Sequence, residues 1–330
     1  MKNYKFFIGI LVSVIIAVPS YFLGQEFKII GGAVFAILIG MIVSLFKTPT
    51  VLEAGIRFTS KKILQYSIIL IGFGLDMKAV LEVGRQSILV MICTISASLL
   101  TAYFIGKILK LKGNTRILIG VGTSICGGSA IAATAPIIEA DDQDIAYSIS
   151  TIFLFNIIAV FIFPALGRYL GLSDMGFGMW AGTAINDTSS VVAAGYTFSN
   201  AAGDYATIVK LTRTLMIIPI TLFLAFYRIK KDNVQNNRSN YKFSSIFPWF
   251  VIGFLLTSII NTVGILPALI TELLNNAGKF GIIIAMAAIG LNTNLKKLIV
   301  NGIRPIILGL SCWAVITGVS LIVQSLIGIF

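Results

Sequence analysis

The sequence predicts an all-α polytopic membrane protein with about nine to eleven transmembrane helices. Hydrophobic residues make up 57% of the 330 residues and charged residues only 12%, whereas a soluble domain carries roughly 25% charged residues. Apolar segments near the length of about 20 residues that a bilayer requires follow one another along most of the chain. Basic residues gather in the connections that would share one side of the membrane. These observations exclude a soluble enzyme and a disordered chain.

Eleven apolar segments are the predicted membrane elements. In chain order they are 6–23, 29–46, 63–80, 86–106, 116–138, 145–167, 174–196, 205–227, 246–264, 279–295 and 304–328. The first follows Lys2 and Lys5 as in a signal peptide, but no small-x-small cleavage site comes after it, so we expect a retained helix. We interpret 48–62 as an amphipathic connector and the polar stretch 228–245 as a cytoplasmic loop. The chain 1–330 is then one integral membrane domain.

The basic residues sort onto one side if the N-terminus is cytoplasmic. Nineteen of the 25 Lys and Arg residues, Arg168 among them, then fall in cytoplasmic connections, and four fall outside. The acidic stretch 139–144 is expected outside. The net charge of +12 therefore indicates a multi-pass protein of the cell membrane, which contacts lipid and not nucleic acid. The last two basic residues, Lys210 and Arg213, lie inside an apolar run, where ionisable groups usually face a cavity or a partner.

Two segments of the chain repeat each other at a constant offset of 60 residues. The segment 122–133, GTSICGGSAIAA, aligns with 182–193, GTAINDTSSVVA. The units that contain these segments are 116–167 and 174–227. Internal duplication of this kind, with helix-weakening residues near the middle of an apolar segment, indicates the binding site of a secondary transporter built from inverted repeats.

Both repeated segments carry residues that break a helix. These are Gly127 and Gly128 in the first copy and the polar run 186–190 in the second. A broken helix exposes main-chain groups that a membrane tolerates only where they line a cavity or bind a ligand. We therefore expect two discontinuous segments that form the site. Their threading stays open: they are re-entrant hairpins that enter from opposite sides, or full spans that run parallel.

The candidate site residues surround these breaks. The predicted substrate-binding residues are Lys210, Arg213, Ser129, Asn186, Thr188, Ser189, Gly127 and Gly128. The cations share one helix face and would bind an oxyanion, Arg by two parallel hydrogen bonds and Lys as a point charge. The alternatives are a structural ion pair with Asp187 or Asp204, or snorkelling of Lys210 to the surface. The small polar residues could equally serve helix packing.

Asp187 lies within the second break and is the predicted site of a coupling ion, Na⁺ or H⁺. The alternative is a helix cap, because an Asp before a helix accepts from the amides of its first turn. Asn156, Asn292 and Asn294 are expected mainly to join helices by hydrogen bonds.

The chain contains no histidine and three scattered cysteines. We therefore expect neither an enzyme nor a metal or cofactor site. The nearest approach to a catalytic motif is Gly72-Phe-Gly-Leu-Asp76, in which an extra Leu separates the residues that an intramembrane aspartyl protease would need. The chain also lacks the glycine-rich Walker motif that cradles ATP phosphates.

The motifs at 122–133 and 182–195, together with ATIVKLTR at 206–213 and the following Pro219, resemble those of the YeiH-type sulfate exporter family. The resemblance covers nearly the whole chain. It implies a bacterial inner-membrane protein of about ten spans, distantly similar to carriers with two inverted five-helix repeats. Some members carry His where this chain has Asn186. Any proton coupling here would instead need a carboxylate such as Asp187.

These features favour a secondary transporter, and specifically an exporter, for a small anion such as sulfate or an organic sulfonate. Transport would be coupled to Na⁺ or H⁺, or uncoupled. The alternative is an anion channel or a membrane subunit of a larger complex, because broken helices also occur there. The large apolar helix faces are compatible with a homodimer.

Overall fold

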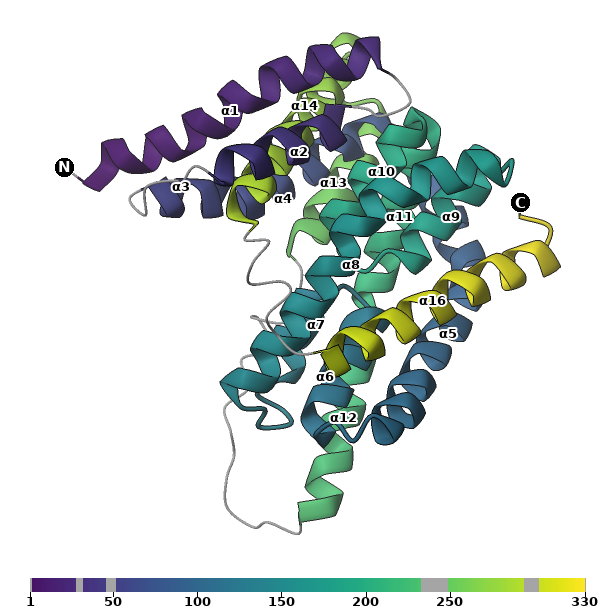
Figure 1. Ribbon diagram of the computed structural model, residues 1–330. Coiled ribbons are helices and arrows are strands. Elements are labelled where there is room, and N and C mark those ends of the chain that lie inside the picture. The colour runs from purple at the N-terminus through teal and green to yellow at the C-terminus, as the bar shows by residue number, and fades with distance from the viewer. Residues whose placement is uncertain (1, 28–31, 46–51, 233–248, 294–302, 330) are drawn as a thin grey trace.

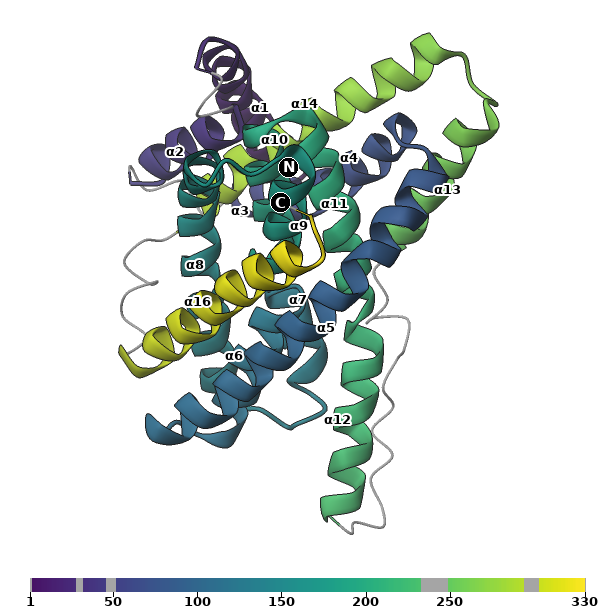
Figure 2. The ribbon, with the colours of Figure 1, turned by 90° about the vertical axis from the view of Figure 1, so that its right-hand side faces the viewer.

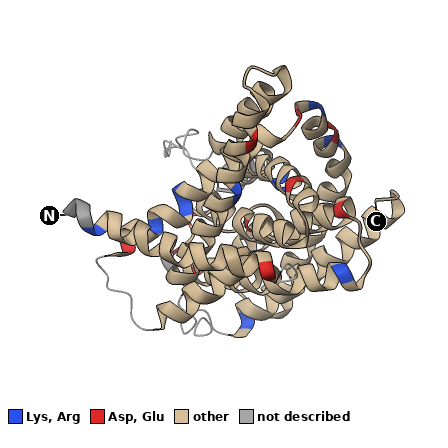
Figure 3. Ribbon diagram, turned by 90° about the horizontal axis from the view of Figure 1, so that it is seen from above, with Lys and Arg blue, Asp and Glu red and all other residues tan. Residues whose placement is uncertain are grey.

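The computed structural model describes residues 2–27, 32–45, 52–232, 249–293 and 303–329. Within these ranges every regular element is a helix, which confirms the predicted all-α class. Six of the described helices are long and apolar enough to cross a membrane, and two shorter apolar helices accompany them. Charged residues occupy only short stretches of the ribbon (Figure 3), as expected where most of the surface meets lipid.

The helices form two groups (Figures 1 and 2). One consists of α1 (Lys2–Glu26), α2 (Gly32–Ser44), α3 (Glu53–Phe58), α4 (Leu64–Ile71), α13 (Trp249–Val263) and α14 (Ala268–Asn292). The other consists of α5 (Met77–Ile108), α6 (Gly113–Ser124), α7 (Gly128–Thr134), α8 (Asp142–Tyr169), α9 (Asp174–Ala184), α10 (Thr188–Phe198), α11 (Asn200–Leu215), α12 (Ile217–Asp232) and α16 (Ile303–Leu326). In the first group α1, α2, α3 and α4 pack on α14, and α13 packs on α4; in the second group α16 lies along α5.

Two glycines allow α2 and α14 to cross at close range. A Cβ on Gly40 would lie 2.5 Å from the carbonyl oxygen of Ala287, and a Cβ on Gly290 would lie 2.4 Å from that of Ile37. Small residues at such crossings are typical of membrane helices, whose association depends on close van der Waals packing. This crossing holds the first helix group together.

The helices α6 and α7 form a hairpin that begins and ends at the start of α8. Before α6, the Nζ atom of Lys112 lies 3.3 Å from a carboxylate oxygen of Asp141, which precedes α8. In the first turn of α6, the hydroxyl of Thr115 donates to the carboxylate of Asp144. Each of these contacts joins residues 29 positions apart in the chain, so the starts of α6 and α8 lie side by side. The chain enters, breaks after Ser124 and returns to the side from which it came.

The helices α9 and α10 form a second hairpin at the other end of α8. The Ser199 hydroxyl, just beyond α10, donates to Asp174 at the start of α9 over 2.6 Å. In the last turn of α8, Arg168 donates to the carbonyl oxygen of Thr197 near the end of α10, over 2.7 Å. The two hairpins therefore enter from opposite ends of α8. This is the first of the two threadings left open by the sequence.

The hairpins change two side assignments made from the basic residues. Arg168 lies at the end of α8 opposite to Lys112, so the expectation that both share the cytoplasmic side is wrong. The acidic residues before α8 lie at the end of Lys112, because Asp141 pairs with it, so the expectation that they are external while Lys112 is cytoplasmic is wrong too. Both errors have one cause, because a re-entrant hairpin does not carry the chain to the other side of the membrane.

Several predicted boundaries differ from those of the helices. The segment 63–80 covers two helices, because α4 ends at Ile71 and a short 3₁₀ turn leads to Asp76, which caps α5 by accepting from the Lys78 amide at 2.6 Å. The connector 48–62 is largely helical, since α3 continues through a π-helical turn, Thr59–Ile63, into α4. The predicted loop 228–245 begins within α12, and its part from 233 on lies outside the described residues.

Candidate functional site

Two fully buried cations lie one turn apart on α11. Lys210 and Arg213 are each 0% exposed. Their spacing places them on one face of the helix, and that face contacts the ends of α6 and α9, where both hairpins break. The two cations thus lie where the hairpin tips meet.

The ammonium of Lys210 joins the two hairpins. Its Nζ atom donates to the carbonyl oxygen of Ile125 over 2.7 Å and to that of Ile185 over 2.9 Å. These residues directly follow α6 and α9 and are equivalent under the offset of 60. The end of a helix leaves carbonyl groups without donors and carries partial negative charge. Lys210 donates to one such carbonyl group at each of the two helix ends.

The guanidinium of Arg213 binds the same two helix ends. Its Nε donates to the carbonyl oxygen of Ser124 over 2.7 Å and its Nη2 to that of Thr123 over 2.9 Å, while its Nη1 donates to the carbonyl of Thr183. Thr123 and Thr183 are again equivalent under the offset. Five carbonyl groups of the two broken helices are therefore held by one turn of α11.

The ion pairs considered for these cations do not form. In the part of the chain that the structure describes, ion pairs join Arg57 to Glu53 and Lys112 to Asp141. Asp204 instead accepts from the Tyr196 hydroxyl over 2.5 Å. Lys210 also does not snorkel, because it is fully buried. Both cations therefore lie behind the main chain of the hairpin tips and donate their hydrogen bonds to its carbonyl oxygens.

Asn156 holds the second break from the middle of α8. Its Oδ1 accepts from the amides of Asn186 and Asp187, each over 3.2 Å. Its Nδ2 lies 3.7 Å from the position of a Cβ on Gly127, in the first break. The side chain is only 3% exposed and lies between the two tips. These hydrogen bonds join α8 to the second hairpin, as expected of a residue that links helices.

Asp187 caps the N-terminus of α10. Its carboxylate accepts from the amide of Ser189 over 2.9 Å and from the hydroxyl of the same residue. This is the capping role considered from the sequence. The side chain is half-buried and lies two residues after Ile185, whose carbonyl oxygen accepts from Lys210. Asp187 therefore lies beside the cluster at the second break.

The first break has an open side. Gly127 adopts a φ of +66°, which a residue with a side chain rarely takes. A Cβ on Gly128 would meet nothing within 4 Å, and Ser129 is exposed. The two tips are close here, because a Cβ on Gly127 would lie 3.8 Å from the Cα of Asp187. Gly127 therefore allows the main-chain turn at the first break, and Gly128 leaves space beside that turn.

The polar residues of the second break are buried. Asn186, Thr188 and Ser189 are 1%, 9% and 4% exposed. The Oδ1 of Asn186 is buried and lacks a hydrogen-bond partner among the described residues. A buried polar atom of this kind is costly unless a ligand or water satisfies it. Asn186 thus marks the side of the second tip that has capacity left for a ligand.

The other polar residues considered lie apart from the cluster. Asn292 donates to Ser60 over 3.4 Å at an exposed position, and Asn294 lies outside the described residues. Among the residues that the structure describes, no group of three His, Cys, Asp or Glu side chains is arranged to hold a metal ion.

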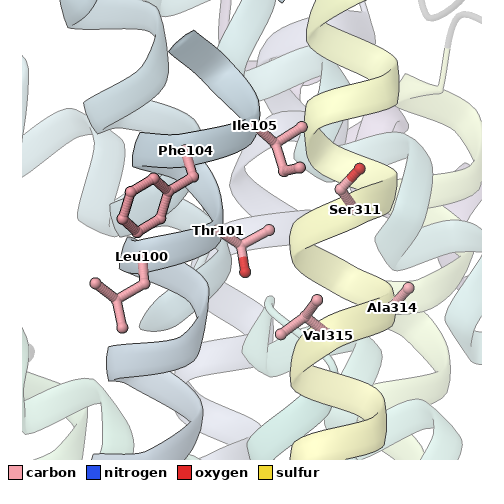
Figure 4. Close-up of a pocket in the computed structure, with 7 residues that line it drawn as sticks. All are labelled: Leu100, Thr101, Phe104, Ile105, Ser311, Ala314 and Val315. Carbon is pink, nitrogen blue, oxygen red and sulfur yellow. The ribbon is translucent and has the colours of Figure 1, made fainter. Parts of the chain in front are cut away.

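A separate groove lies between α5 and α16 (Figure 4). Its volume is about 430 Å³, and it is lined by Leu100, Thr101, Phe104, Ile105, Ser311, Ala314 and Val315. It shares no residue with the cluster at the hairpin tips, and its lining offers only two hydroxyl groups for polar contact.

The position of Asn156 could have been found from the repeat itself. It lies 30 residues after Cys126 in the first break and 30 residues before Asn186 in the second. A helix between two opposed hairpins must pass both tips near its middle. A polar residue midway between the breaks is therefore the one that can contact both.

Comparison with known proteins shows that the chain is similar to a family of membrane proteins. Residues 8–309 match the family described as conserved hypothetical protein 698. A UPF0324 membrane protein of Streptococcus mutans is 52% identical over 98% of this chain and 97% of its own length. Those of Fusobacterium nucleatum and Clostridium tetani are 48% and 44% identical, each over 98% of both chains. No solved structure matches the chain.

Proposed function

The chain belongs to the UPF0324 family of membrane proteins, and from this premise we propose that it is a secondary transporter of a small anion. We propose further that it resides in the cytoplasmic membrane with its N-terminus inside and exports its substrate, which is sulfate or an organic sulfonate. The chain is a multi-pass membrane protein. We infer transport from the cluster at the hairpin tips.

One observation carries the proposal. Two cations, each 0% exposed, lie behind the tips of two opposed re-entrant hairpins near the middle of a long helix. Buried charge is expensive to keep in a membrane, and it usually marks a substrate or ion pathway. Because no carboxylate forms an ion pair with either cation among the described residues, the positive charge remains available to attract an anion.

The substrate would sit on the open side of the tips. Gly128 leaves space for it, Ser129 is exposed, and Asn186, Thr188 and Ser189 supply polar groups from the other hairpin. Lys210 and Arg213 would act through their charge, because their hydrogen bonds hold the helix ends in place. This division of roles assigns a function to seven of the eight predicted substrate-binding residues, and Gly127, with its φ of +66°, shapes the turn of the first break.

Any coupling cation would bind at Asp187. It is half-buried and lies at the tip of the second hairpin, two residues after Ile185, whose carbonyl oxygen accepts from Lys210. A proton or Na⁺ on this carboxylate would change the charge that an anion meets, which is the physical basis of coupling. The contact of the two tips near Gly127 favours a carrier over an open channel.

A thermal-shift screen tests the proposal. The purified protein is heated with sulfate, thiosulfate, sulfite, sulfonates or carboxylates, with and without Na⁺. A ligand that binds only the folded state must raise its stability, so we expect at least one anion to raise the unfolding temperature in a saturable way. The Lys210→Met variant should lose that shift. If no anion shifts the wild-type protein, the anion site is absent.

A further inference from the structure

We propose that the groove between α5 and α16 binds an anionic phospholipid, with an acyl chain in the groove and the phosphate at the end where α5 stops and α16 starts. The inference goes beyond the proposed transport function and does not depend on it, because the groove shares no residue with the cluster at the hairpin tips. It rests on the lining of the groove, on the direction of its two helices and on the charges at one end.

The lining of the groove suits a hydrocarbon chain. Five of its seven residues are Leu, Phe, Ile, Ala or Val. The other two are hydroxyl residues that donate within their own helices, Thr101 to the carbonyl oxygen of Ala97 over 2.7 Å and Ser311 to that of Ile307 over 2.9 Å. Each hydroxyl has a single hydrogen to donate. The groove therefore offers its occupant apolar contact and no free hydroxyl donor.

The two helices run in opposite directions along the groove. Ile105 of α5 lies opposite Ser311 of α16 (Figure 4). One turn further along each helix, Thr101 lies opposite Val315. The end of α5 and the start of α16 therefore lie at the same end of the groove, as Figures 1 and 2 also show.

This end of the groove is basic. Arg304 lies seven residues, about two turns, before Ser311, so it shares the face of α16 that lines the groove. Lys107 is in the last turn of α5, and Lys110 follows that helix. All three cations are exposed and form no ion pair among the described residues. The helix α16 has no acidic residue, and the only one of α5, Glu82, is near its opposite end.

An anionic phospholipid matches the apolar groove and its basic end together. Its acyl chain lies at the depth of the bilayer core, and its phosphate lies at the interface, where the ends of membrane helices place their basic side chains. Basic pockets between membrane helices bind anionic head groups for this reason. The groove and the cations are arranged along the helices in the same order as the chain and the phosphate along a lipid.

A second copy of the protein matches the same face less well. Two copies with the same orientation in one membrane are related by an axis along the membrane normal, so a symmetric contact joins like ends. Arg304 and the two lysines would then meet the same cations of the other copy, and like charges repel. The charges at this end therefore favour a lipid as the occupant.

A lipid in the groove should stabilise the folded protein through α16. This helix contacts the second hairpin as well as α5: the Nε1 of Trp180 donates to the carbonyl oxygen of Thr317 over 3.1 Å, and the hydroxyls of Thr183 and Ser320 share a hydrogen bond of 2.6 Å. An occupant that packs against both α5 and α16 holds these contacts in place. Binding to the folded state alone must raise the unfolding temperature.

Two lipids with identical chains test the proposal. The purified protein is heated in a neutral detergent with dioleoyl phosphatidylglycerol or dioleoyl phosphatidylcholine at the same mole fraction. These lipids differ in the net charge of the head group. We expect phosphatidylglycerol to raise the unfolding temperature of the wild-type protein more than phosphatidylcholine does.

A matched pair of double variants locates the charge effect. Arg304→Gln with Lys110→Gln removes two cations at the basic end, and it should abolish the preference for phosphatidylglycerol. Lys78→Gln with Arg85→Gln removes two exposed cations near the other end of α5, and it should keep the preference. The comparison is between two lipids on one protein, so a uniform change in stability cancels.

A substitution in the lining tests the acyl chain. Ala314→Trp fills the groove, and the purified variant should retain less phosphatidylglycerol in a native mass spectrum than the wild-type protein does. Ile92→Trp is the control, because that exposed residue of α5 lies outside the lining. It should retain as much lipid as wild type.

Three outcomes would overturn the proposal. Equal stabilisation of the wild-type protein by the two lipids would remove the role of the charge. An equal loss of preference in both double variants would show a general attraction of the basic protein to anionic lipid. A dimer that Ala314→Trp dissociates, with bound phospholipid unchanged, would make a second copy the occupant. None of these results bears on anion binding at the hairpin tips.

Discussion

The carbonyl oxygens of Ile125 and Ile185, which are 60 residues apart in the chain, share the ammonium group of Lys210 at 2.7 and 2.9 Å. Each residue directly follows the first helix of its hairpin. One side chain of α11 therefore contacts both hairpin tips and links their positions. Any movement of one tip relative to the other must lengthen at least one of these hydrogen bonds.

Replacement of Arg213 should impair both folding and transport. Arg213→Ala removes the donors of three carbonyl groups, and each buried polar group left unpaired costs about 1–3 kcal/mol. We expect the variant to insert into the membrane, to unfold at a lower temperature and to lose anion flux. Arg57→Ala, which breaks an exposed pair with Glu53, should change stability by at most about 1 kcal/mol. Undiminished flux of folded Arg213→Ala in vesicles would contradict a role at the site.

Substitutions of Asn156 should separate its structural and electrostatic roles. Asn156→Leu leaves the amides of Asn186 and Asp187 without their acceptor and should lower the unfolding temperature. Asn156→Asp keeps an acceptor but adds a negative charge between the tips, so it should remain folded and bind anions more weakly. Thermal unfolding with and without anion measures both effects. Equal anion binding by wild type and Asn156→Asp would show that the tips do not hold the anion.

The hairpin threading predicts which residues share a side of the membrane. Single cysteines at Lys110 and Gln143 flank the first hairpin, and those at Met175 and Asn200 flank the second; all four positions are exposed. With Cys93, Cys126 and Cys312 replaced by serine, a membrane-impermeant thiol reagent should label the first two cysteines from one side and the last two from the other. Labelling of positions 110 and 143 from different sides would mean that the first hairpin crosses the membrane.

The start of α8 predicts a small dependence of stability on pH. Asp141 accepts from the Asp144 amide at 2.8 Å and pairs with Lys112, and both interactions lower its pKa below the ordinary value of 3.8, with the amide hydrogen bond as the largest single cause. A lowered pKa contributes stability at neutral pH that is lost as the pH falls below 3.8 through the folded-state value. Asp141→Asn should therefore be less stable than wild type at pH 7, with a smaller difference at pH 3. A difference that does not shrink would assign the effect to packing.

The membrane class and the two breaks could be predicted from the sequence because both depend on local composition. Apolar length gives the spans, and the polar run 186–190 and the Gly127-Gly128 pair mark the places where a helix cannot continue without cost. The breaks lie between α6 and α7 and between α9 and α10, at equivalent positions of the repeat.

The contacts of the site could not be predicted in the same way. The partners of Lys210 and Arg213 are carbonyl groups, and a main-chain group has no sequence signature. The sequence therefore pointed to acidic partners, which are visible in it, and missed the ends of α6 and α9. The threading depended on contacts such as those of Lys112 with Asp141 and of Ser199 with Asp174, which a hydropathy pattern does not contain.

Counterflow across reconstituted vesicles tests the anion site at the two hairpin tips most directly. Vesicles loaded with an unlabelled anion that stabilises the purified protein are diluted into trace amounts of the labelled anion. We predict that wild-type protein accumulates label transiently and saturably. The variant Lys210→Met should not, because it removes the hydrogen-bond donor shared by the carbonyl groups of Ile125 and Ile185. Counterflow by folded Lys210→Met at the wild-type rate, or passage of anion as unsaturable current, would contradict a carrier built on this cluster.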